Sequence, residues 1–328
     1  MRRILITGGT GFVGTHLVRH LQSTPSQIIV ASYGSDPSLH EPGIEYRRTD
    51  IRNRDEVHSV MREFNPDLVY HLAAVSAVGP SWSNPRLTFE VNVLGSFNIF
   101  EAAMNLPSPP RILNVSTSQI YARSSGPLSE NSPLNPENPY AASKAMTELL
   151  MVQYRNCVNG GIITARSFNH TGPGQLPTFV LSSIAKQLAA IELGLASPTL
   201  KVGNTAVTRD FTDVRDVVNA YGLLLEKGTT GEVYNVCSGR PVLLADVIKK
   251  FQMNCRASIT VEVDQDRVRP SDAAKMVGDP TKIHTATGWV PDIPLETTIR
   301  DLQEYWRGRV SREWLTWENG LKAETPTQ

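Results

Sequence analysis

A glycine-rich turn between a short apolar run and a helix-like segment constrains the fold of this chain more than any other feature. The apolar residues 4–6 lead into residues 7–14, TGGTGFVG. The first turn of a helix carries unpaired backbone N–H groups and the positive end of the helix dipole, so it binds phosphate where no side chain blocks the backbone. Gly8, Gly11 and Gly14 keep that approach open. The turn predicts a pyrophosphate site or, because its spacing is G-x-x-G-x-x-G and not G-x-G-x-x-G, a tight connection without a ligand.

Apolar runs and helix-like segments alternate over the first half of the chain. Short apolar runs predict strands at residues 4–6, 28–31, 44–47, 67–74, 111–115, 161–165 and 233–236. Helical spacing is found at residues 15–22, 55–64, 85–104 and 139–156. Such alternation implies parallel strands joined by right-handed crossovers, with helices on both faces of the sheet. We therefore predict an α/β fold with a Rossmann-like, doubly wound parallel sheet.

The pattern changes at residue 168, where Gly, Pro and Asn become frequent. We predict a dinucleotide-binding Rossmann domain over residues 1–167, to which residues 208–240 return. Residues 168–207 and 241–328 are predicted to form a smaller C-terminal domain that binds the substrate over the carboxyl ends of the strands.

The charge balance and the cysteine content narrow the partners and the compartment. The 328 residues include 32 Lys and Arg and 32 Asp and Glu, so no global field attracts nucleic acid or an anionic membrane surface. No stretch is apolar enough to span a bilayer. Cys157, Cys237 and Cys255 are odd in number and lack metal-ligand spacing, which fits a reducing compartment. We expect a cytoplasmic protein that binds neither nucleic acid nor membrane nor metal.

The end of the second predicted strand bears on the choice of cofactor. Sites that select NAD usually place a carboxylate there, which bonds the ribose hydroxyls and repels the 2′-phosphate of NADP. The residue here is Ser32, whose hydroxyl can bond that phosphate, although no arginine follows at once. We therefore predict NADP (NADPH), with NAD as the alternative. After the strand at residues 67–74, we expect Leu72, Ala73 and Ala74 to let a flat cofactor lie against the backbone.

Tyr140 and Lys144 form a Tyr-x-x-x-Lys motif near the start of the helix predicted from Pro139. Positions i and i+4 share one helix face, and a nearby ammonium lowers the pKa of a phenol from about 10 toward neutrality. Tyr140 can then transfer a proton, and Lys144 can also hold the nicotinamide ribose. Thr117, after the strand at 111–115, should bond the same substrate oxygen. Alone, the motif also fits an ordinary amphipathic helix. Because it follows the glycine turn and then Ser116-Thr117 along the chain, an active site is favoured.

With these motifs in this order, the sequence resembles the extended short-chain dehydrogenase/reductases that act on nucleotide sugars, over nearly the whole chain. The matching segments are residues 7–14, 50–51, 71–74, 92–95, 116–117 and 140–144. The resemblance implies an adenine contact at residues 50–51, a helix bulge shaped by Asn92, and a homodimer packed through the helices that begin at Pro85 and Pro139. The residues predicted to bind the cofactor are Gly8, Gly11, Phe12, Val13, Ser32, Asp50, Ile51, Leu72, Ala73, Ala74, Tyr140 and Lys144.

The second half of the chain resembles the GDP-mannose branch of that family, which contains a 4,6-dehydratase and a 4-ketoreductase. This likeness is carried by residues 166–175, 179–180, 209–211, 269–270 and 278–282. It implies that the sugar is contacted by Ser76, Asn169 and Val180. The nucleotide would be contacted by Lys186 and Leu200, and the diphosphate by Arg209 and Arg269. Arginine suits a diphosphate because its planar fork bonds two oxygens at once, although a surface ion pair is the simpler account of each arginine.

Gln119 separates the two activities of that branch. Both reactions need Thr117, Tyr140 and Lys144 at C4 of the sugar, but the dehydratase also needs an acid/base group at C5 and C6. The family places a glutamate two residues after the catalytic threonine, and an amide cannot accept and return a proton near neutral pH. The arginine-rich loop that supports tetramers of the dehydratases is also missing, because residues 33–36 are YGSD.

We therefore predict an NAD(P)H-dependent oxidoreductase, a 4-ketoreductase that converts GDP-4-keto-6-deoxy-D-mannose into a GDP-6-deoxyhexose such as GDP-D-rhamnose. The alternatives are a GDP-mannose 4,6-dehydratase, another nucleotide-sugar epimerase or dehydratase, and a non-catalytic dinucleotide sensor. The intact Thr-Tyr-Lys set argues against a sensor.

Overall fold

The computed structural model describes residues 1–34, 40–154, 161–268 and 273–323, which form parts of two compact units. The first unit comprises Met1–His170, Asp210–Arg240 and Lys275–Asp292, and the second comprises Thr171–Arg209, Pro241–Ala274 and Ile293–Gln328. The chain first passes from one unit to the other within β7 (Asn169–Thr171) and returns within β9 (Thr208–Asp213).

The first unit is built on a seven-stranded sheet in the order β10-β6-β5-β4-β1-β2-β3, in which every pairing is parallel. Its strands are β1 (Arg2–Thr7), β2 (Ser26–Ser32), β3 (Glu45–Arg48), β4 (Leu68–His71), β5 (Arg111–Thr117), β6 (Ile162–Ser167) and β10 (Val233–Val236). The central strands are apolar runs because a parallel sheet is covered on both faces. The prediction of a doubly wound parallel sheet is confirmed.

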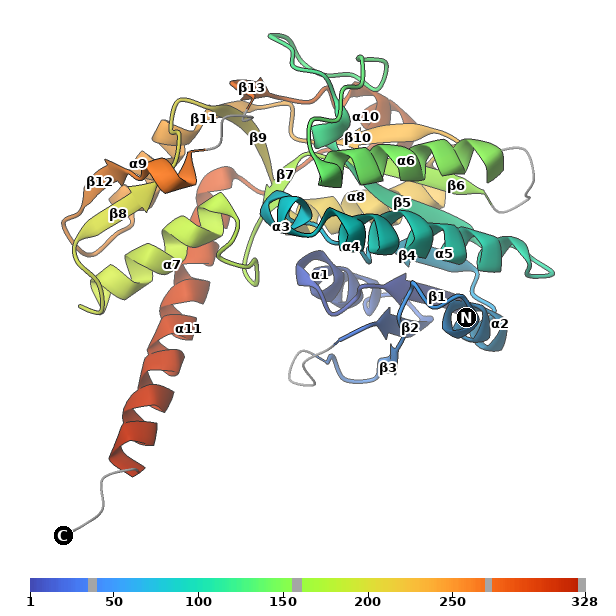
Figure 1. Ribbon diagram of the computed structural model, residues 1–328, viewed down its shortest axis with the longest axis horizontal. Helices are drawn as coiled ribbons and strands as arrows, with labels where there is room; N and C mark the ends of the chain where they lie inside the picture. Colours follow the sequence, from blue (N-terminus) through green and yellow to red (C-terminus); the bar gives the residue numbers. More distant parts are fainter. Residues whose placement is uncertain (35–39, 155–160, 269–272, 324–328) are drawn as a thin grey trace. The chain divides into compact units, whose positions relative to one another are not determined.

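Helices cover both faces of this sheet (Figure 1). The helices of the first unit are α1 (Phe12–Leu21), α2 (Arg54–Phe64), α3 (Val78–Ser83), α4 (Pro85–Phe89), α5 (Gly95–Met104), α6 (Pro139–Tyr154), α8 (Val214–Lys227) and α10 (Thr281–Thr287). The unit also contains the short η3 (Ser118–Ile120) and β13 (Lys275–Met276). One core cluster contains Leu17 of α1 and Tyr221 of α8, and another contains Met61 of α2 and Phe100 of α5. Each cluster buries the apolar stripe of its helices against the strands.

The segment Lys275–Asp292 packs with the first unit, whereas the prediction assigned it to the C-terminal domain. Ile283 of α10 and Trp289 are buried in the same cluster as α1 and α8. The indole N–H of Trp289 also donates to the carbonyl of Asp216 in α8 at 3.0 Å. The prediction was wrong here because these apolar side chains complete a core that is distant in sequence.

The helix predicted over residues 85–104 is interrupted by a π-helical turn, η2 (Glu90–Leu94), between α4 and α5. Asn92 is fully buried in this turn, and its side chain bonds both the N–H and the carbonyl of Val75, at 2.7 and 3.1 Å. Its Nδ2 also donates to the Ser143 hydroxyl of α6 at 2.9 Å. A bulge is therefore present at Asn92, as the resemblance implied, and it connects η2, α6 and the segment after β4.

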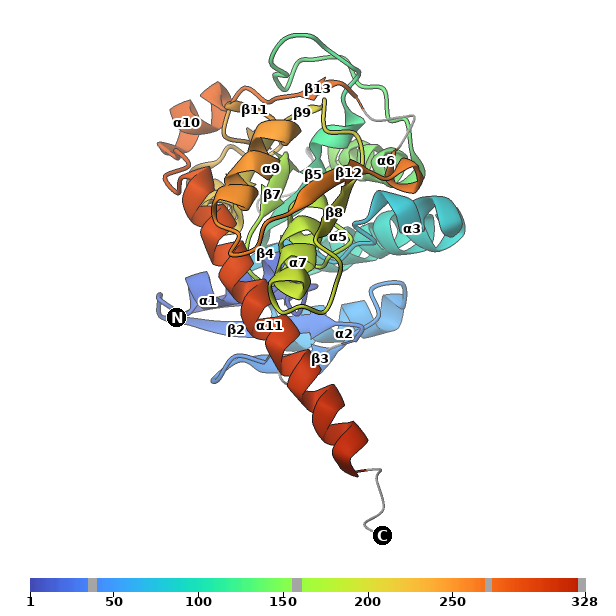
Figure 2. The ribbon, with the colours of Figure 1, turned by 90° about the vertical axis from the view of Figure 1, so that its left-hand side faces the viewer.

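The second unit buries apolar side chains of its own, among them Leu188, Phe251 and Leu302. Its elements are α7 (Val180–Glu192), β8 (Thr199–Val202), β11 (Pro241–Leu243), α9 (Leu244–Met253), β12 (Thr260–Val263), η4 (Gln265–Arg267) and α11 (Leu295–Ala323). The long helix α11 runs along α7 (Figure 2), and the indole N–H of Trp306 donates to the hydroxyl of Ser182 in α7 at 2.9 Å. Gln303 of α11 donates to the carbonyl of Phe251 in α9 at 3.1 Å. These contacts attach α11 to both neighbouring helices.

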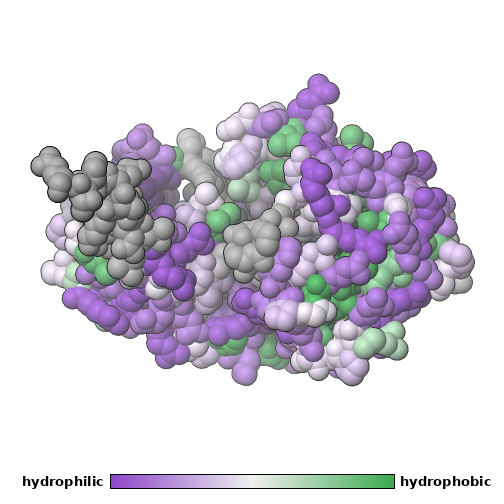
Figure 3. Space-filling view, turned by 90° about the horizontal axis from the view of Figure 1, so that it is seen from below, coloured by the Kyte–Doolittle hydropathy of each residue, from purple (hydrophilic) through white to green (hydrophobic). Residues whose placement is uncertain are grey.

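On the face drawn in Figure 3, apolar residues are scattered among hydrophilic ones wherever the surface is coloured. No helix in the described part of the chain is long and apolar enough to cross a membrane. Among the same residues, no group of three or more His, Cys, Asp or Glu side chains is placed to hold a metal ion.

Candidate active site

The glycine turn brings backbone segments close together at the end of β1. Gly8 has a φ of +70°, which residues with side chains rarely adopt, and a Cβ there would lie 2.8 Å from the backbone of Ala73. A Cβ at Gly14 would lie 2.5 Å from the carbonyl oxygen of Gly8. The N-cap of α1 is Gly11, and no side chain in the described part of the chain caps it. The first turn of α1 is therefore able to bind an anion through its backbone.

The residues predicted to bind the cofactor all lie in the first unit, at or just after the carboxyl ends of its strands or, for Tyr140 and Lys144, in α6. Phe12 and Val13 begin α1, Ser32 ends β2, Asp50 and Ile51 follow β3, and Leu72, Ala73 and Ala74 follow β4. The hydroxyl of Ser32 is buried and has no hydrogen-bond partner among the described residues. A buried polar group without a partner, beside an uncapped helix start, fits a dinucleotide that supplies the missing partner.

A chain of buried hydrogen bonds leads from the glycine turn to α6. The Thr7 hydroxyl contacts Nδ1 of His71 at 2.8 Å, and Nε2 of His71 contacts the Ser96 hydroxyl at 2.8 Å. Ser96 donates to the carbonyl of Asn92, whose side chain donates to Ser143. Burial lowers the pKa of His71 to about 3, so the ring is neutral. The sequence showed His71 only as part of a motif, since its partners are far from it along the chain.

Thr117, Tyr140 and Lys144 come together where β5 ends beside the first turns of α6. Thr117 is the last residue of β5, and its hydroxyl lies near enough to the Tyr140 phenol to affect the pKa of that phenol. Nζ of Lys144 donates to the carbonyl of Val115 at 2.7 Å, and the lysine is 4% exposed. Burial lowers the pKa of Lys144 to about 8, against the opposing charge of Glu148. We call Thr117, Tyr140 and Lys144 the catalytic corner.

The pKa of Tyr140 differs from the prediction. Burial raises it above the ordinary value of a phenol, and the Thr117 hydroxyl opposes that rise. The motif predicted a lowered pKa because the ammonium was expected to face the phenol. Instead, the ammonium of Lys144 bonds the Val115 carbonyl, and the phenolate would lose its hydration on burial. Tyr140 is therefore a protonated phenol near neutral pH and can act as a proton donor.

Gln119 lies next to the catalytic corner, in η3. Its backbone N–H donates to Oγ1 of Thr117 at 3.3 Å, and its side-chain oxygen accepts from Nδ2 of Asn138 at 3.1 Å. Asn138 also accepts from the N–H of Ala141 at 2.8 Å, at the start of α6. An amide is thus held beside the helix turn that carries Tyr140.

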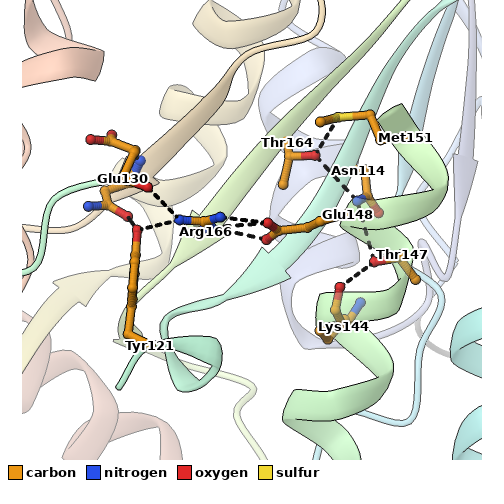
Figure 4. A network of polar contacts seen from close by, with 10 residues as sticks. Asn114, Tyr121, Glu130, Lys144, Thr147, Glu148, Met151, Thr164 and Arg166 are labelled. Atoms are coloured by element: carbon orange, nitrogen blue, oxygen red, sulfur yellow. Dashed lines mark hydrogen bonds and ion pairs between the residues drawn. The ribbon is translucent and has the colours of Figure 1, made fainter. Parts of the chain in front are cut away.

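A second buried polar cluster lies beside these residues (Figure 4). Arg166 of β6 forms an ion pair with Glu148 of α6, with Nη2 and Oε2 2.7 Å apart and both side chains less than a tenth exposed. Nη1 of Arg166 donates to the Tyr121 hydroxyl at 2.9 Å and to the Glu130 carbonyl at 3.0 Å. Tyr121 donates in turn to Asn235 at 2.7 Å. We call these five residues the Arg166 cluster; the sequence did not predict it.

The residues predicted to bind the substrate are divided between the two units. In the first unit, Ser76 is exposed after β4, and Asn169 begins β7. His170, next to Asn169, stacks on Phe12 with ring centroids 6.2 Å apart. This contact connects the start of β7 to the glycine turn.

In the second unit, Val180 begins α7, and Lys186 lies on the same helix with Nζ 5.4 Å from the ring centroid of Trp306. Leu200 is fully buried in β8. Arg209 donates hydrogen bonds to the carbonyls of Thr208 and Ala273. A shallow pocket on this unit is lined by Lys186, Gln187, Ala190, Ile191, Ala196 and Thr199. Arg269 lies outside the described residues.

Comparisons with known proteins show which sequences and solved structures this chain resembles. Residues 5–302 match the family described as GDP-mannose 4,6 dehydratase. The chain is 33% identical to the GDP-6-deoxy-D-mannose reductase of Pseudomonas aeruginosa over 95% of its own length and 99% of that protein. The solved structure of RMD from Pseudomonas aeruginosa, complexed with NADPH, matches 94% of this chain and 100% of that one at 33% identity, with a TM-score of 0.82. A UDP-glucose 4-epimerase from Thermus thermophilus, in complex with NAD, matches at 30% identity, 93% and 99% coverage and a TM-score of 0.84.

Proposed function

Because the chain belongs to the GDP-mannose 4,6-dehydratase family of NAD(P)-dependent oxidoreductases, we propose that it is a 4-ketoreductase of a GDP-linked sugar. Its substrate is GDP-4-keto-6-deoxy-D-mannose, and its product is a GDP-6-deoxyhexose such as GDP-D-rhamnose. The observation that carries this proposal is Gln119, an amide beside the catalytic corner where elimination needs a carboxyl group. Likeness to the Pseudomonas aeruginosa reductase supports the same choice over a dehydratase.

The catalytic corner suits proton donation to a ketone oxygen. NADPH, when bound at the glycine turn, supplies the hydride for C4 of the sugar. Tyr140, whose raised pKa keeps it protonated, donates its proton to O4, and Thr117 holds that oxygen by its hydroxyl. Nζ of Lys144 donates to the Val115 carbonyl at the same corner, where the lysine would hold the nicotinamide ribose of the bound cofactor. Catalytic roles for these three residues are part of the proposal.

The substrate contacts follow from the same proposal. The first unit binds the dinucleotide, while the second unit, which comprises Thr171–Arg209, Pro241–Ala274 and Ile293–Gln328, provides most of the nucleotide-sugar contacts. The residues proposed to contact the substrate are Ser76, Asn169, Val180, Lys186, Leu200, Arg209 and Arg269. Leu200 is fully buried, so a contact with the substrate would require the residues that cover it to move.

We also propose a homodimer that packs through α4, η2, α5 and α6. Leu94, Met146 and Leu149 are large apolar side chains on these helices, and they are 58%, 43% and 69% exposed. Pairing with a second copy would remove them from water. Light scattering after gel filtration tests this, and a monomeric mass at micromolar concentration would exclude it.

The function is tested by offering the purified protein NADPH with GDP-4-keto-6-deoxymannose and with its dTDP and UDP counterparts. We expect loss of nicotinamide absorbance with the GDP sugar. Incubation with GDP-mannose and no added cofactor tests the dehydratase alternative, since formation of a keto sugar would overturn the reductase proposal. Failure to oxidise NADPH with any of these sugars would favour a non-catalytic sensor.

A further inference from the structure

The end of β2 carries an unusual group of side chains on the surface of the first unit. Tyr33, the residue after Ser32, is 58% exposed. The guanidinium carbons of Arg48 and Arg52 each lie 5.4 Å from the centroid of its ring. Two guanidinium groups on one exposed aromatic ring concentrate positive charge on a chain whose formal net charge is zero.

This group adjoins the glycine turn. Gly8 donates its N–H to the carbonyl of Ala31 at 2.9 Å, and the hydroxyl of Thr10 donates to the carbonyl of Gly34 at 3.2 Å. The end of β2 is therefore bonded to the turn that is able to bind a pyrophosphate. In dinucleotide sites of this fold, the adenosine ribose lies at the end of this strand.

The two arginines come from β3 and the residues after it, not from the loop after β2. The parallel register of β2 and β3 places Arg48 directly beside Ser32. The Ser32 hydroxyl is buried without a partner in the described part of the chain. Arg52 is held in place by Asp50, with Nη2 and Oδ2 2.6 Å apart, which offsets one of the two positive charges. Arg48 is in none of the ion pairs between described residues, and although its charge also acts on the Asp50 carboxylate, its guanidinium is left to bond a ligand.

We propose that Arg48, with Arg52 and Ser32, binds the 2′-phosphate of NADPH and so selects NADP over NAD. A guanidinium bonds two phosphate oxygens at once, while its flat face packs on an aromatic ring. Arg48 is the main ligand because Arg52 is already paired with a carboxylate. The inference rests on the proposed function only in requiring that the glycine turn binds a dinucleotide.

Calorimetric titration of the full chain with 2′,5′-ADP and with 5′-AMP tests the site without any turnover. We expect the unmodified protein to bind 2′,5′-ADP at least about tenfold more tightly, since a charge-assisted hydrogen bond is worth that factor or more. Arg48→Gln should remove most of this preference and leave 5′-AMP binding unchanged. Arg52→Gln should remove less of it, and Arg48→Lys should restore part.

Arg47→Gln is the matched control, because Arg47 is the neighbouring arginine of β3 and bonds Glu45 and Glu63 instead. It should leave both affinities unchanged. Equal binding of the two nucleotides by the unmodified protein, or an unchanged preference in the double variant Arg48→Gln, Arg52→Gln, would overturn the inference. Titration with NADH separates the two proposals: if NADH binds and the preference is absent, only the inference fails, and if neither NADH nor NADPH binds, the proposed function fails with it.

Discussion

The catalytic corner and the Arg166 cluster share helix α6, where Lys144 and Glu148 are one turn apart, but they differ in how completely their charges are paired. In the catalytic corner the buried ammonium of Lys144 bonds a neutral carbonyl, and burial lowers its pKa to about 8. In the Arg166 cluster, burial would lower the pKa of Arg166, yet the bonds to Glu148 hold it above its ordinary value. Lys144 can therefore lose its proton near physiological pH, whereas Arg166 cannot.

This difference separates chemistry from structure within one helix. A buried group with incomplete pairing has a shifted pKa and can exchange protons, which is a property of active sites. A buried ion pair with all its partners is rigid, and removing one partner leaves an uncompensated charge. Variants at the catalytic corner should therefore lower the rate, and variants in the Arg166 cluster should lower stability.

The largest expected effect is on the rate of Tyr140→Phe. Loss of the proton donor should slow reduction of the keto sugar by about 10²- to 10⁴-fold, with the free energy of unfolding little changed. Tyr121→Phe is the matched variant in the Arg166 cluster, where Arg166 and Asn235 each lose a hydrogen-bond partner. It should cost about 1–3 kcal/mol of stability and leave the rate nearly intact. Both variants are measured by steady-state kinetics and urea unfolding. If both lowered the rate, or both lowered stability, the two clusters would not differ in role as described above.

Glu148→Gln should give the largest loss of stability. It leaves the guanidinium of Arg166, which is 5% exposed, without its counter-ion, at a cost of about 3–5 kcal/mol. Glu101→Gln is the control, because Glu101 pairs with Arg54 and His58 near the surface, where solvent weakens ion pairs, so its loss of stability should be much smaller. Urea unfolding of both proteins provides the measurement. Equal losses would mean that the Arg166–Glu148 pair is not the rigid element described above.

The elements that set up both clusters could be predicted from the sequence, but their charges could not. Apolar runs located the strands, and the spacing of Tyr140 and Lys144 placed both on one helix. The spacing of residues along a helix does not show how deeply they are buried, so the predicted direction of the Tyr140 pKa shift was wrong. Arg166 and Glu148 meet only because α6 packs beside β6, and Arg48 lies beside Ser32 only through strand register.

A third prediction concerns the pH dependence of the catalytic corner. If the charged form of Lys144 supports reduction, kcat/KM should fall as the pH rises through about 8. The charge of Glu148 raises the pKa of Lys144, so Glu148→Gln should lower that pKa and move the alkaline limb to lower pH. His71 is neutral and Tyr140 is protonated in this range, so neither opposes the shift. The profile is measured on protein that circular dichroism shows to be folded.

Glu101→Gln again serves as the control for that profile, since its surface pair with Arg54 belongs to neither buried cluster. Its alkaline limb should coincide with that of the unmodified protein. A limb that does not move in Glu148→Gln, or that moves to higher pH, would show that the two clusters are not coupled through α6.

The smallest expected effect on rate, and the most direct test of the reductase assignment, is that of Gln119→Glu. A glutamate can still accept the hydrogen bond from Asn138, so the reduction rate should change little. The new carboxylate would lie beside the catalytic corner and could remove the C5 proton, which the C4 ketone makes acidic. In deuterated water the variant should therefore place deuterium at C5 of the product, whereas the unmodified protein should not. Mass spectrometry of the product distinguishes them, and deuterium at C5 from the unmodified protein would mean that another group already acts as that base.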